Sequence, residues 1–219
     1  MAKTLATMKT RIAAEIVRGD LDVDIENAIR DAIDTYQGER FWFNEPTLAT
    51  EPTFVTVIGQ ATYGAAANPQ IPLMFSIDYM TYVDGGTVFE IIRRSPKEVE
   101  LANQIGQVAG PPCEYAYAGG NITIYPTPAA VYTIRIFGQI NLAAPVDDTE
   151  DNNVWMNTAE KLIRCRAKFE LATHKTRNKD MAATFNPENP AGPTAFAFRE
   201  LKAQTNKLTQ LGRIQEMPF

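Results

Sequence analysis

Few residues in this chain could carry out catalytic or metal chemistry, and His174 is the first of them. It is the only histidine, so any Ser–His, Cys–His or two-histidine metal site would depend on it. It falls late in an expected helix, close to Lys175, Arg177 and Lys179, where cations complement the negative end of the helix dipole. We interpret His174 as a solvent-exposed helix-end residue. The three cations form a solvated basic cluster that could contact phosphate or an acidic partner surface.

The cysteines and the acidic runs do not have metal-site spacing either. Cys113 and Cys165 are far apart and belong to no CxxC or Cys/His pattern, so we expect neither a zinc site nor a disulfide framework, and a reducing compartment fits. The Asp-x-Asp-x-Asp spacing over residues 20–24 is that of a calcium loop, but Ile25 stands where such a loop needs glycine. The run continues into a helical pattern, so we favour a helix start over a metal site.

The common catalytic motifs are missing from the sequence. There is no Gly-x-Ser-x-Gly, no glycine-rich phosphate loop ending in Lys-Ser/Thr, and no strand followed by GxGxxG. No spaced pair of carboxylates lies on an expected core strand, where a glycosidase would need it. We therefore expect no enzymatic activity, no cofactor and no bound metal.

The charge balance disfavours sequence-specific DNA binding, since 26 acidic residues outnumber 21 basic ones and the net charge is −5. A mildly acidic surface suits a protein that DNA passes without adhering, although solubility alone explains the same charge. The amphipathic N-terminus lacks the apolar core of a signal peptide, and no apolar run is long enough to span a bilayer. We expect no membrane partner, and a protein kept in the cytoplasm unless it leaves inside a larger assembly.

Helical periodicity occurs near both ends of the chain. The first helix is expected over about residues 3–18, with Gly19 at the C′ position. Asn157–Glu160 has the pattern of a capping box and should begin a helix that runs toward Thr176, the longest element expected. Further helices are expected over about 25–36, over 96–104 behind a Ser95–Glu98 capping box, and from Thr194 onward, after a non-helical segment over 185–193.

Between about residues 53 and 140 the pattern changes to short alternating runs broken by glycine and proline. The expected strands are Thr53–Ile58, Leu73–Val83 with a bend near Asp78, Thr87–Ile92, Cys113–Ala118, 122–124 and 131–136. Gly85-Gly86 and Gly119-Gly120 are expected as hairpin glycines. The last two strands, on either side of Tyr125–Pro128, are predicted to form a β-hairpin with one face in the core. The aromatics of Phe41–Phe43 are expected mainly in the core.

These elements predict an α+β fold. The N- and C-terminal helices would form an antiparallel helical bundle into which an antiparallel β-sandwich or barrel-like domain is inserted. The expected divisions are an N-terminal helical hairpin over 1–45, the β-domain over 46–145, and C-terminal helices with an extended tail over 146–219.

The order of these signatures, from Thr4 to about Phe185, resembles that of the tailed-phage head-to-tail adaptor (connector, or head completion) family. The segments that carry the resemblance are Thr4-Leu5, Ile29–Ile33 closing on Phe41–Glu45, Gly59–Tyr63, Ser95-Pro96, Gly110–Pro112 leading to Tyr115-Ala116, and Ile124–Pro128 ahead of Tyr-Thr-Ile-Arg. The alanine-rich segment Gly64–Pro69 departs from the family pattern.

The resemblance implies a structural protein without catalytic activity. Such proteins form a ring, usually of twelve copies, beneath the portal protein, and join it to tail or nozzle proteins around the DNA channel. For this chain it implies a place in the virion neck, assembly in the host cytoplasm, and genomic DNA that passes without sequence-specific binding. The candidate interface residues are Met217, Pro218 and Phe219, a tail that could insert into a neighbour or the portal, together with the basic cluster.

Two other functions remain open from the sequence. One is a carbohydrate- or receptor-binding β-module of a phage tail or fibre, with exposed tyrosines as stacking platforms, although alternating strands would bury many of them. The tyrosines concerned are Tyr63, Tyr79, Tyr82, Tyr115 and Tyr117. The other is an enzyme with an unrecognised site.

Overall fold

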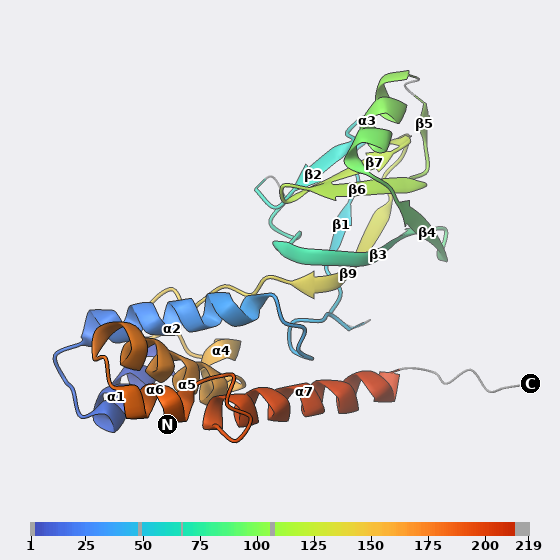
Figure 1. Ribbon diagram of the computed structural model, residues 1–219. Coiled ribbons are helices and arrows are strands. Elements are labelled where there is room, and N and C mark those ends of the chain that lie inside the picture. The colour runs from blue at the N-terminus through green and yellow to red at the C-terminus, as the bar shows by residue number, and fades with distance from the viewer. Residues whose placement is uncertain (1–2, 48–49, 67, 106–107, 213–219) are drawn as a thin grey trace, which may run out of the picture. The chain divides into compact units, whose positions relative to one another are not determined.

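The computed structural model describes residues 3–47, 50–66, 68–105 and 108–212 (Figure 1). Its internal contacts divide the chain into two units. One, the helical unit, combines Met1–Phe43 with Leu142–Phe219, and the other, the β unit, is Asn44–Asn141. Each unit has an apolar core of its own, and the fold is mixed α+β, as the sequence predicts.

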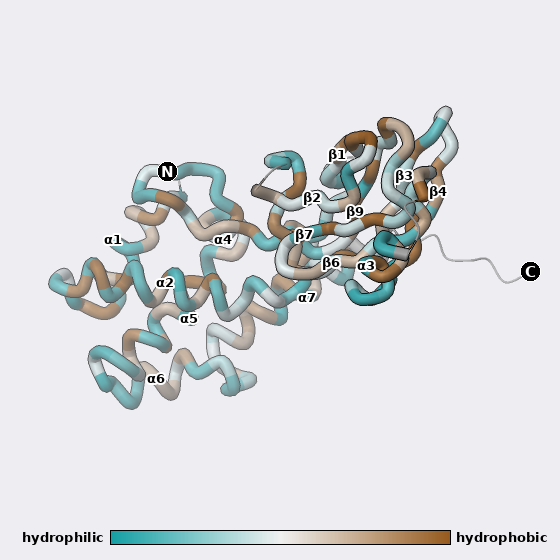
Figure 2. The backbone as a smooth tube through the Cα atoms, turned by 90° about the horizontal axis from the view of Figure 1, so that it is seen from above, coloured by the Kyte–Doolittle hydropathy of each residue, from teal (hydrophilic) through white to brown (hydrophobic). Residues whose placement is uncertain are grey.

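The helical unit is built from amphipathic helices that share one core. Its elements are α1 (Leu5–Ile16), α2 (Asp22–Gln37), α4 (Val154–Asn157), α5 (Glu160–Glu170), the π-helical turn η1 (Leu171–Lys175), α6 (Lys179–Phe185) and α7 (Pro193–Gly212). Along these helices hydrophobic and hydrophilic residues alternate (Figure 2), and the apolar stripes of α1, α2, α5 and α7 meet in the core. Within the described residues, no helix combines the length and the apolar character needed to cross a bilayer.

The aromatic run after α2 is split between core and surface. Phe41 is fully buried, and Phe43 packs against the core with its ring 5.5 Å from that of Trp155. Trp42 remains partly exposed. The prediction that these aromatics lie mainly in the core is confirmed for the two phenylalanines.

The first helix ends earlier than predicted, and on a residue that is not glycine. Val17, and not Gly19, adopts the left-handed conformation, with φ of 55°. The N–H of Val17 donates to the carbonyls of Ala13 and Ala14, and the N–H of Arg18 donates to Ala13 O. The left-handed conformation of Val17 thus lets the chain satisfy carbonyls in the last turn of the helix. A β-branched residue in this region is strained.

The C-terminal helices also differ from the prediction. Asn157 does not cap a long helix, because it is the last residue of the short α4, which is capped instead by Asn153 through Trp155 N–H. Helix α5 begins at Glu160 without a side-chain cap and passes into η1. The longest helix is therefore α7, with 20 residues, and the additional helix α6 had no clear signal in the sequence.

The described part of the β unit contains a curled sheet of seven strands, a separate pair of short strands and the helix α3 (Pro96–Ile105). The strands are β1 (Thr53–Val55), β2 (Thr62–Gly64), β3 (Met74–Asp84), β4 (Thr87–Arg93), β6 (Glu114–Ala118), β7 (Asn121–Tyr125) and β9 (Thr133–Ile140), in the order β1-β9-β3-β4-β6-β7-β2. The strands β5 (Ala109–Gly110) and β8 (Thr127–Pro128) pair separately. The prediction of an antiparallel sheet is wrong for one pair, since β4 and β6 run parallel. The expected sandwich or barrel-like domain is, in the structure, a curled seven-stranded sheet with the β5–β8 pair beside it in the same unit.

The predicted hairpin across Tyr125–Pro128 is wrong. Strand β7 pairs with β6 and β2, whereas β9 pairs with β1 and β3. Pro126 and Pro128 cannot donate to a ladder, so the chain leaves the sheet here and crosses to a different place in it. The hairpins that form are β6–β7, across Gly119-Gly120, and β3–β4, across Gly85-Gly86.

Two local predictions within the β unit are confirmed. The β3–β9 register shifts between Ile77 and Tyr79, which is the bend expected near Asp78. Helix α3 (Pro96–Ile105) begins in a capping box, because Ser95 N–H donates to a Glu98 carboxylate oxygen at 3.0 Å and Glu98 N–H donates to Ser95 Oγ at 3.3 Å.

Candidate interaction surfaces

The groups with catalytic potential are dispersed. His174 is 74% exposed, with Nε2 3.3 Å from Glu170 Oε2 on the preceding turn, in agreement with the helix-end prediction. Burial raises the pKa of the Cys165 thiol, which disfavours the thiolate, and Cys113 is an exposed free cysteine. The described part of the chain contains no group of His, Cys, Asp and Glu side chains arranged to hold a metal ion.

The acidic run over residues 20–24 links three parts of the helical unit. Each aspartate forms an ion pair with a different cation, on α1, just after α1 or at the end of η1. The pairs are Asp20 with Arg18 at 2.7 Å, Asp22 with Lys9 at 3.0 Å, and Asp24 with Lys175 at 2.9 Å. The carboxylates thus serve as ion-pair partners around the start of α2.

Lys9 is the centre of the strongest of these networks. It is 6% exposed, and its Nζ lies 3.0 to 3.3 Å from carboxylate oxygens of Asp22, Glu26 and Asp148. Burial alone would lower the pKa of Lys9, but the hydrogen bonds to the three carboxylates outweigh it and raise the pKa above its ordinary value. The network joins α1 and α2 to the segment before α4.

The predicted basic cluster is on the surface around the end of η1. Lys175, Arg177 and Lys179 are all exposed, and they are brought together by a sharp turn in which Arg177 has a left-handed backbone with φ of 51°. Lys175 already pairs with Asp24, so part of its charge is neutralised within the unit. The other predicted interface residues, Met217, Pro218 and Phe219, lie outside the described residues.

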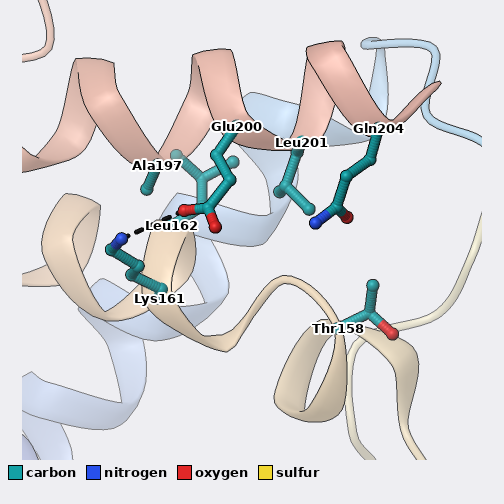
Figure 3. Close-up of a pocket in the computed structure, with 7 residues that line it drawn as sticks. All are labelled: Thr158, Lys161, Leu162, Ala197, Glu200, Leu201 and Gln204. Atoms are coloured by element: carbon teal, nitrogen blue, oxygen red, sulfur yellow. Dashed lines mark hydrogen bonds and ion pairs between the residues drawn. The ribbon is translucent and has the colours of Figure 1, made fainter. Parts of the chain in front are cut away.

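A small recess separates α5 from α7 (Figure 3). Leu162, Ala197 and Leu201 form its apolar wall, and an ion pair of 3.0 Å between Lys161 and Glu200 spans one side. Gln204 extends from α7 on the other side, and Thr158 contributes a hydroxyl from the C-terminal end of α4. At about 110 Å³ the recess has room for a side chain, and it lacks a nucleophile paired with a base.

The tyrosines considered as glycan platforms are mostly inside the β unit. Tyr63, Tyr82 and Tyr115 are buried, and the Tyr63 hydroxyl donates to Gln60 O at 2.7 Å. Tyr117 is partly buried and donates to Met74 O. Tyr79 alone of the five is well exposed, and its ring stacks on Phe137 with a 4.4 Å centroid distance. Three of the proposed platforms are therefore core residues and cannot present a ring face to a sugar.

The face of the sheet opposite the core carries rows of residues in cross-strand register. One row consists of Val55, Thr133, Val83 and Val88, and the next of Thr53, Arg135, Thr81 and Glu90. Arg135 faces Glu51 at 3.7 Å. The exposed valines at the two ends of the first row, Val55 and Val88, leave apolar surface on β1 and β4.

The β unit carries most of the net negative charge. Residues 44–141 contain eight acidic and four basic side chains, a net charge of −4 out of −5 for the chain. Arg94 and Arg135 are in ion pairs with Glu114 and Glu51, and Arg93 donates to Ile77 O. The unit therefore offers little basic surface to a phosphate backbone.

Comparison with known proteins agrees with a structural role. No curated protein matches the chain. A family model described as SU10 adaptor protein matches residues 3–200, a span that includes the whole β unit and nearly all of the described helical unit. Because this match covers most of the chain, the protein belongs to the SU10 adaptor protein family, a family of phage head-to-tail adaptors.

Proposed function

We propose that this chain is the subunit of a ring that joins the portal to the tail and surrounds the DNA channel. The observation that carries the proposal is the family match across both units. The family consists of structural phage proteins, so the chain is a virion component that contacts other head and tail proteins. The ring, its twelve copies and its place in the neck are our proposal, as is assembly in the host cytoplasm.

Charge and chemistry support passage of DNA rather than binding. A channel lined by carboxylates repels phosphate, and the acidic β unit has few cations free to hold it. The dispersed histidine and cysteines offer no reaction centre. We therefore propose that genomic DNA passes without sequence-specific contact.

Each part of the chain has a proposed role. We assign the helical segments 1–45 and 146–219 to contacts within the ring and with the portal, and segment 46–145 to contacts with neighbouring copies and tail or nozzle proteins. Met217, Pro218 and Phe219 would anchor in the portal or a neighbour, and the cluster of Lys175, Arg177 and Lys179 would face an acidic partner surface.

The decisive experiment is to mix the purified protein with the portal protein of the same phage and measure the mass and symmetry of the product. Native mass spectrometry and electron microscopy should find a closed ring attached to the portal. A chain that stays monomeric and never joins the portal would refute the proposal. Deletion of residues 214–219 should weaken docking, and unchanged docking would remove the tail from the interface.

The basic cluster has a matched control in the β unit. Lys179→Glu, a single charge reversal at the exposed start of α6, should lower the affinity for the portal or tail partner and make the remaining binding less dependent on salt. Lys97→Glu, an equally exposed charge reversal at the start of α3, should leave that affinity unchanged. Equal effects of both changes would point to net charge and exclude a specific contact by the cluster.

A further inference from the structure

In the described part of the chain, the first half of β4 has a strand partner on one edge only, which is β3. The two-residue turn of the β3–β4 hairpin, Gly85-Gly86, is closed by the pair Asp84 and Thr87, and both glycines have positive φ. In such a hairpin the closing pair is hydrogen-bonded, so Thr87, Phe89 and Ile91 direct their N–H and C=O groups toward β3. The backbone groups of Val88 and Glu90 therefore point away from β3.

The hydrogen bonds further along β4 agree with this alternation. Ile92 N–H, which has the same parity as Val88 and Glu90, donates to Cys113 O of the neighbouring segment at 2.8 Å. The parallel pairing with β6 starts at this point, where Ile92 lies opposite Glu114. Extending the register backward would require Cys113 N–H to donate to Glu90 O, but that N–H donates to Tyr125 O at 2.9 Å. Pairing with β6 therefore begins only at Ile92, and among the described residues no strand pairs with the Val88–Glu90 edge.

A second edge of matching length, on β1, also has no strand partner among the residues that the structure describes. Ile136 N–H donates to Pro52 O and Thr56 N–H donates to Tyr132 O, so the even-numbered residues of this segment face β9. Thr53 and Val55 consequently direct their backbone groups away from β9. Their side chains are exposed, Val55 at 52%, much as Val88 on β4 is at 51%.

We propose that β4 of one copy pairs with β1 of the next copy, so that the sheets of neighbouring subunits form one continuous ladder around the ring. This inference rests on the ring proposed above and names the contact between its subunits. Along the order β1-β9-β3-β4 all three neighbouring pairs are antiparallel, so β4 runs opposite to β1 and the added pair is antiparallel too.

One register between the two strands is consistent with the directions of the backbone N–H and C=O groups on both β4 and β1. With Val88 opposite Val55 of the next copy, Glu90 falls opposite Thr53, and both pairs consist of outward-facing residues that exchange two N–H···O bonds each. Phe89, which is 43% exposed and stacks on Tyr82, then lies opposite the buried Phe54. The two exposed valines become cross-strand neighbours and shield each other from water. The contact uses different surfaces on the two copies, as a closed ring requires.

Val88→Pro tests the edge with little effect on the subunit. The substitution removes an N–H that has no partner in β3, so the isolated subunit should fold as before, with an unchanged circular dichroism spectrum. The subunit concentration needed for half-assembly with the portal should rise about tenfold, the equivalent of one lost hydrogen bond at each interface together with its valine contact. Val88→Thr retains the N–H and the β-branched shape and should assemble as the wild type does.

A cross-linking experiment tests the register itself. In a Cys113→Ser background, Val55→Cys combined with Val88→Cys should give, under oxidation, a ladder of linked subunits up to the closed ring, because hydrogen-bonded strand pairs place their Cα atoms about 5.5 Å apart. Val88→Cys alone should give no ladder. A ring that forms with the portal but shows neither the ladder nor any sensitivity to Val88→Pro overturns this inference and leaves the proposed function intact. Absence of a ring for the wild-type protein overturns both.

Discussion

Replacement of Lys9 by methionine should destabilise the helical unit through the three carboxylates left behind. Methionine fills a similar volume, so the loss is mainly one of charge compensation and not of packing. Removing one partner of a fully buried ion pair costs about 3–5 kcal/mol. Here Asp22, Glu26 and Asp148 retain 68%, 32% and 49% of their side-chain exposure, so water screens part of the repulsion. We expect a loss of about 1–3 kcal/mol in the free energy of unfolding at pH 7.

The loss of unfolding free energy caused by Lys9→Met should become smaller as the pH falls. Hydrogen bonds to Arg30 and Lys9 lower the pKa of Glu26 and outweigh burial, which would raise it. The contribution of Glu26 is therefore present above its unfolded pKa and disappears as the pH falls through its folded pKa. Without Lys9 the three carboxylates repel one another, and Glu26 loses one of the groups that lower its pKa. The difference between wild type and Lys9→Met should therefore shrink as the pH falls from about 5 toward 3. Because the pKa of Lys9 is raised, its own contribution should be lost only at strongly alkaline pH.

Urea unfolding followed by tryptophan fluorescence measures this effect in the relevant unit. Both tryptophans of the chain, Trp42 and Trp155, belong to the helical unit, so the signal does not report on the β unit. Lys161→Met is the matched control, because Lys161 and Glu200 are each about half exposed and such a pair contributes about 0–1 kcal/mol. If Lys9→Met lowers the free energy of unfolding no more than the control does, or lowers it equally at pH 7 and pH 3, the Lys9 network does not stabilise the unit.

Two further predictions concern single positions in the two units. Val17→Gly should stabilise the helical unit by about 0.5–1 kcal/mol in the same assay, because glycine relieves the left-handed strain of Val17. Val23→Gly, at an exposed site inside α2, should instead destabilise it by a similar amount, and the reverse ranking would contradict the assignment of strain. In the β unit, Tyr63→Phe should cost about 1–2 kcal/mol because Gln60 O loses the Tyr63 hydroxyl as a donor. Tyr115→Phe should be neutral or stabilising, since the buried Tyr115 hydroxyl has no hydrogen-bond partner among the described residues. Calorimetry of both variants tests this pair, and an equal loss for the two would contradict the hydrogen-bond reasoning.

The prediction of local structure from sequence succeeded where the controlling interactions are short in range. The Ser95–Glu98 capping box, the hairpin glycines Gly85-Gly86 and Gly119-Gly120, and the apolar stripes of the helices were all confirmed. It failed where a competing neighbour decided the outcome. Asn157 begins a capping-box sequence, but Asn153 caps the short helix α4, of which Asn157 is the last residue. A local pattern does not show which of two nearby cap residues the chain will use.

The candidate surfaces illustrate the same division. The exposed character of His174 and of the cluster formed by Lys175, Arg177 and Lys179 followed from position in a helix. The ion-pair partners of Asp20, Asp22 and Asp24 could not be predicted from position in a helix. Two of the three cations belong to other helical elements and become neighbours only when the helices pack. The open edge of β4 was likewise hidden, because it depends on the register of β6 more than 20 positions further along the chain.

The sequence by itself determined the α+β character, the apolar stripes and alternation that make the two cores, the main turns, and the absence of recognisable catalytic motifs. These follow from side-chain period and backbone preference, which act over a few residues. Only the tertiary structure decided that β7 and β9 separate, that β4 and β6 run parallel, and that a buried lysine gathers three carboxylates. Strand partners and buried charges are chosen by contacts between segments distant in sequence, which no local pattern records.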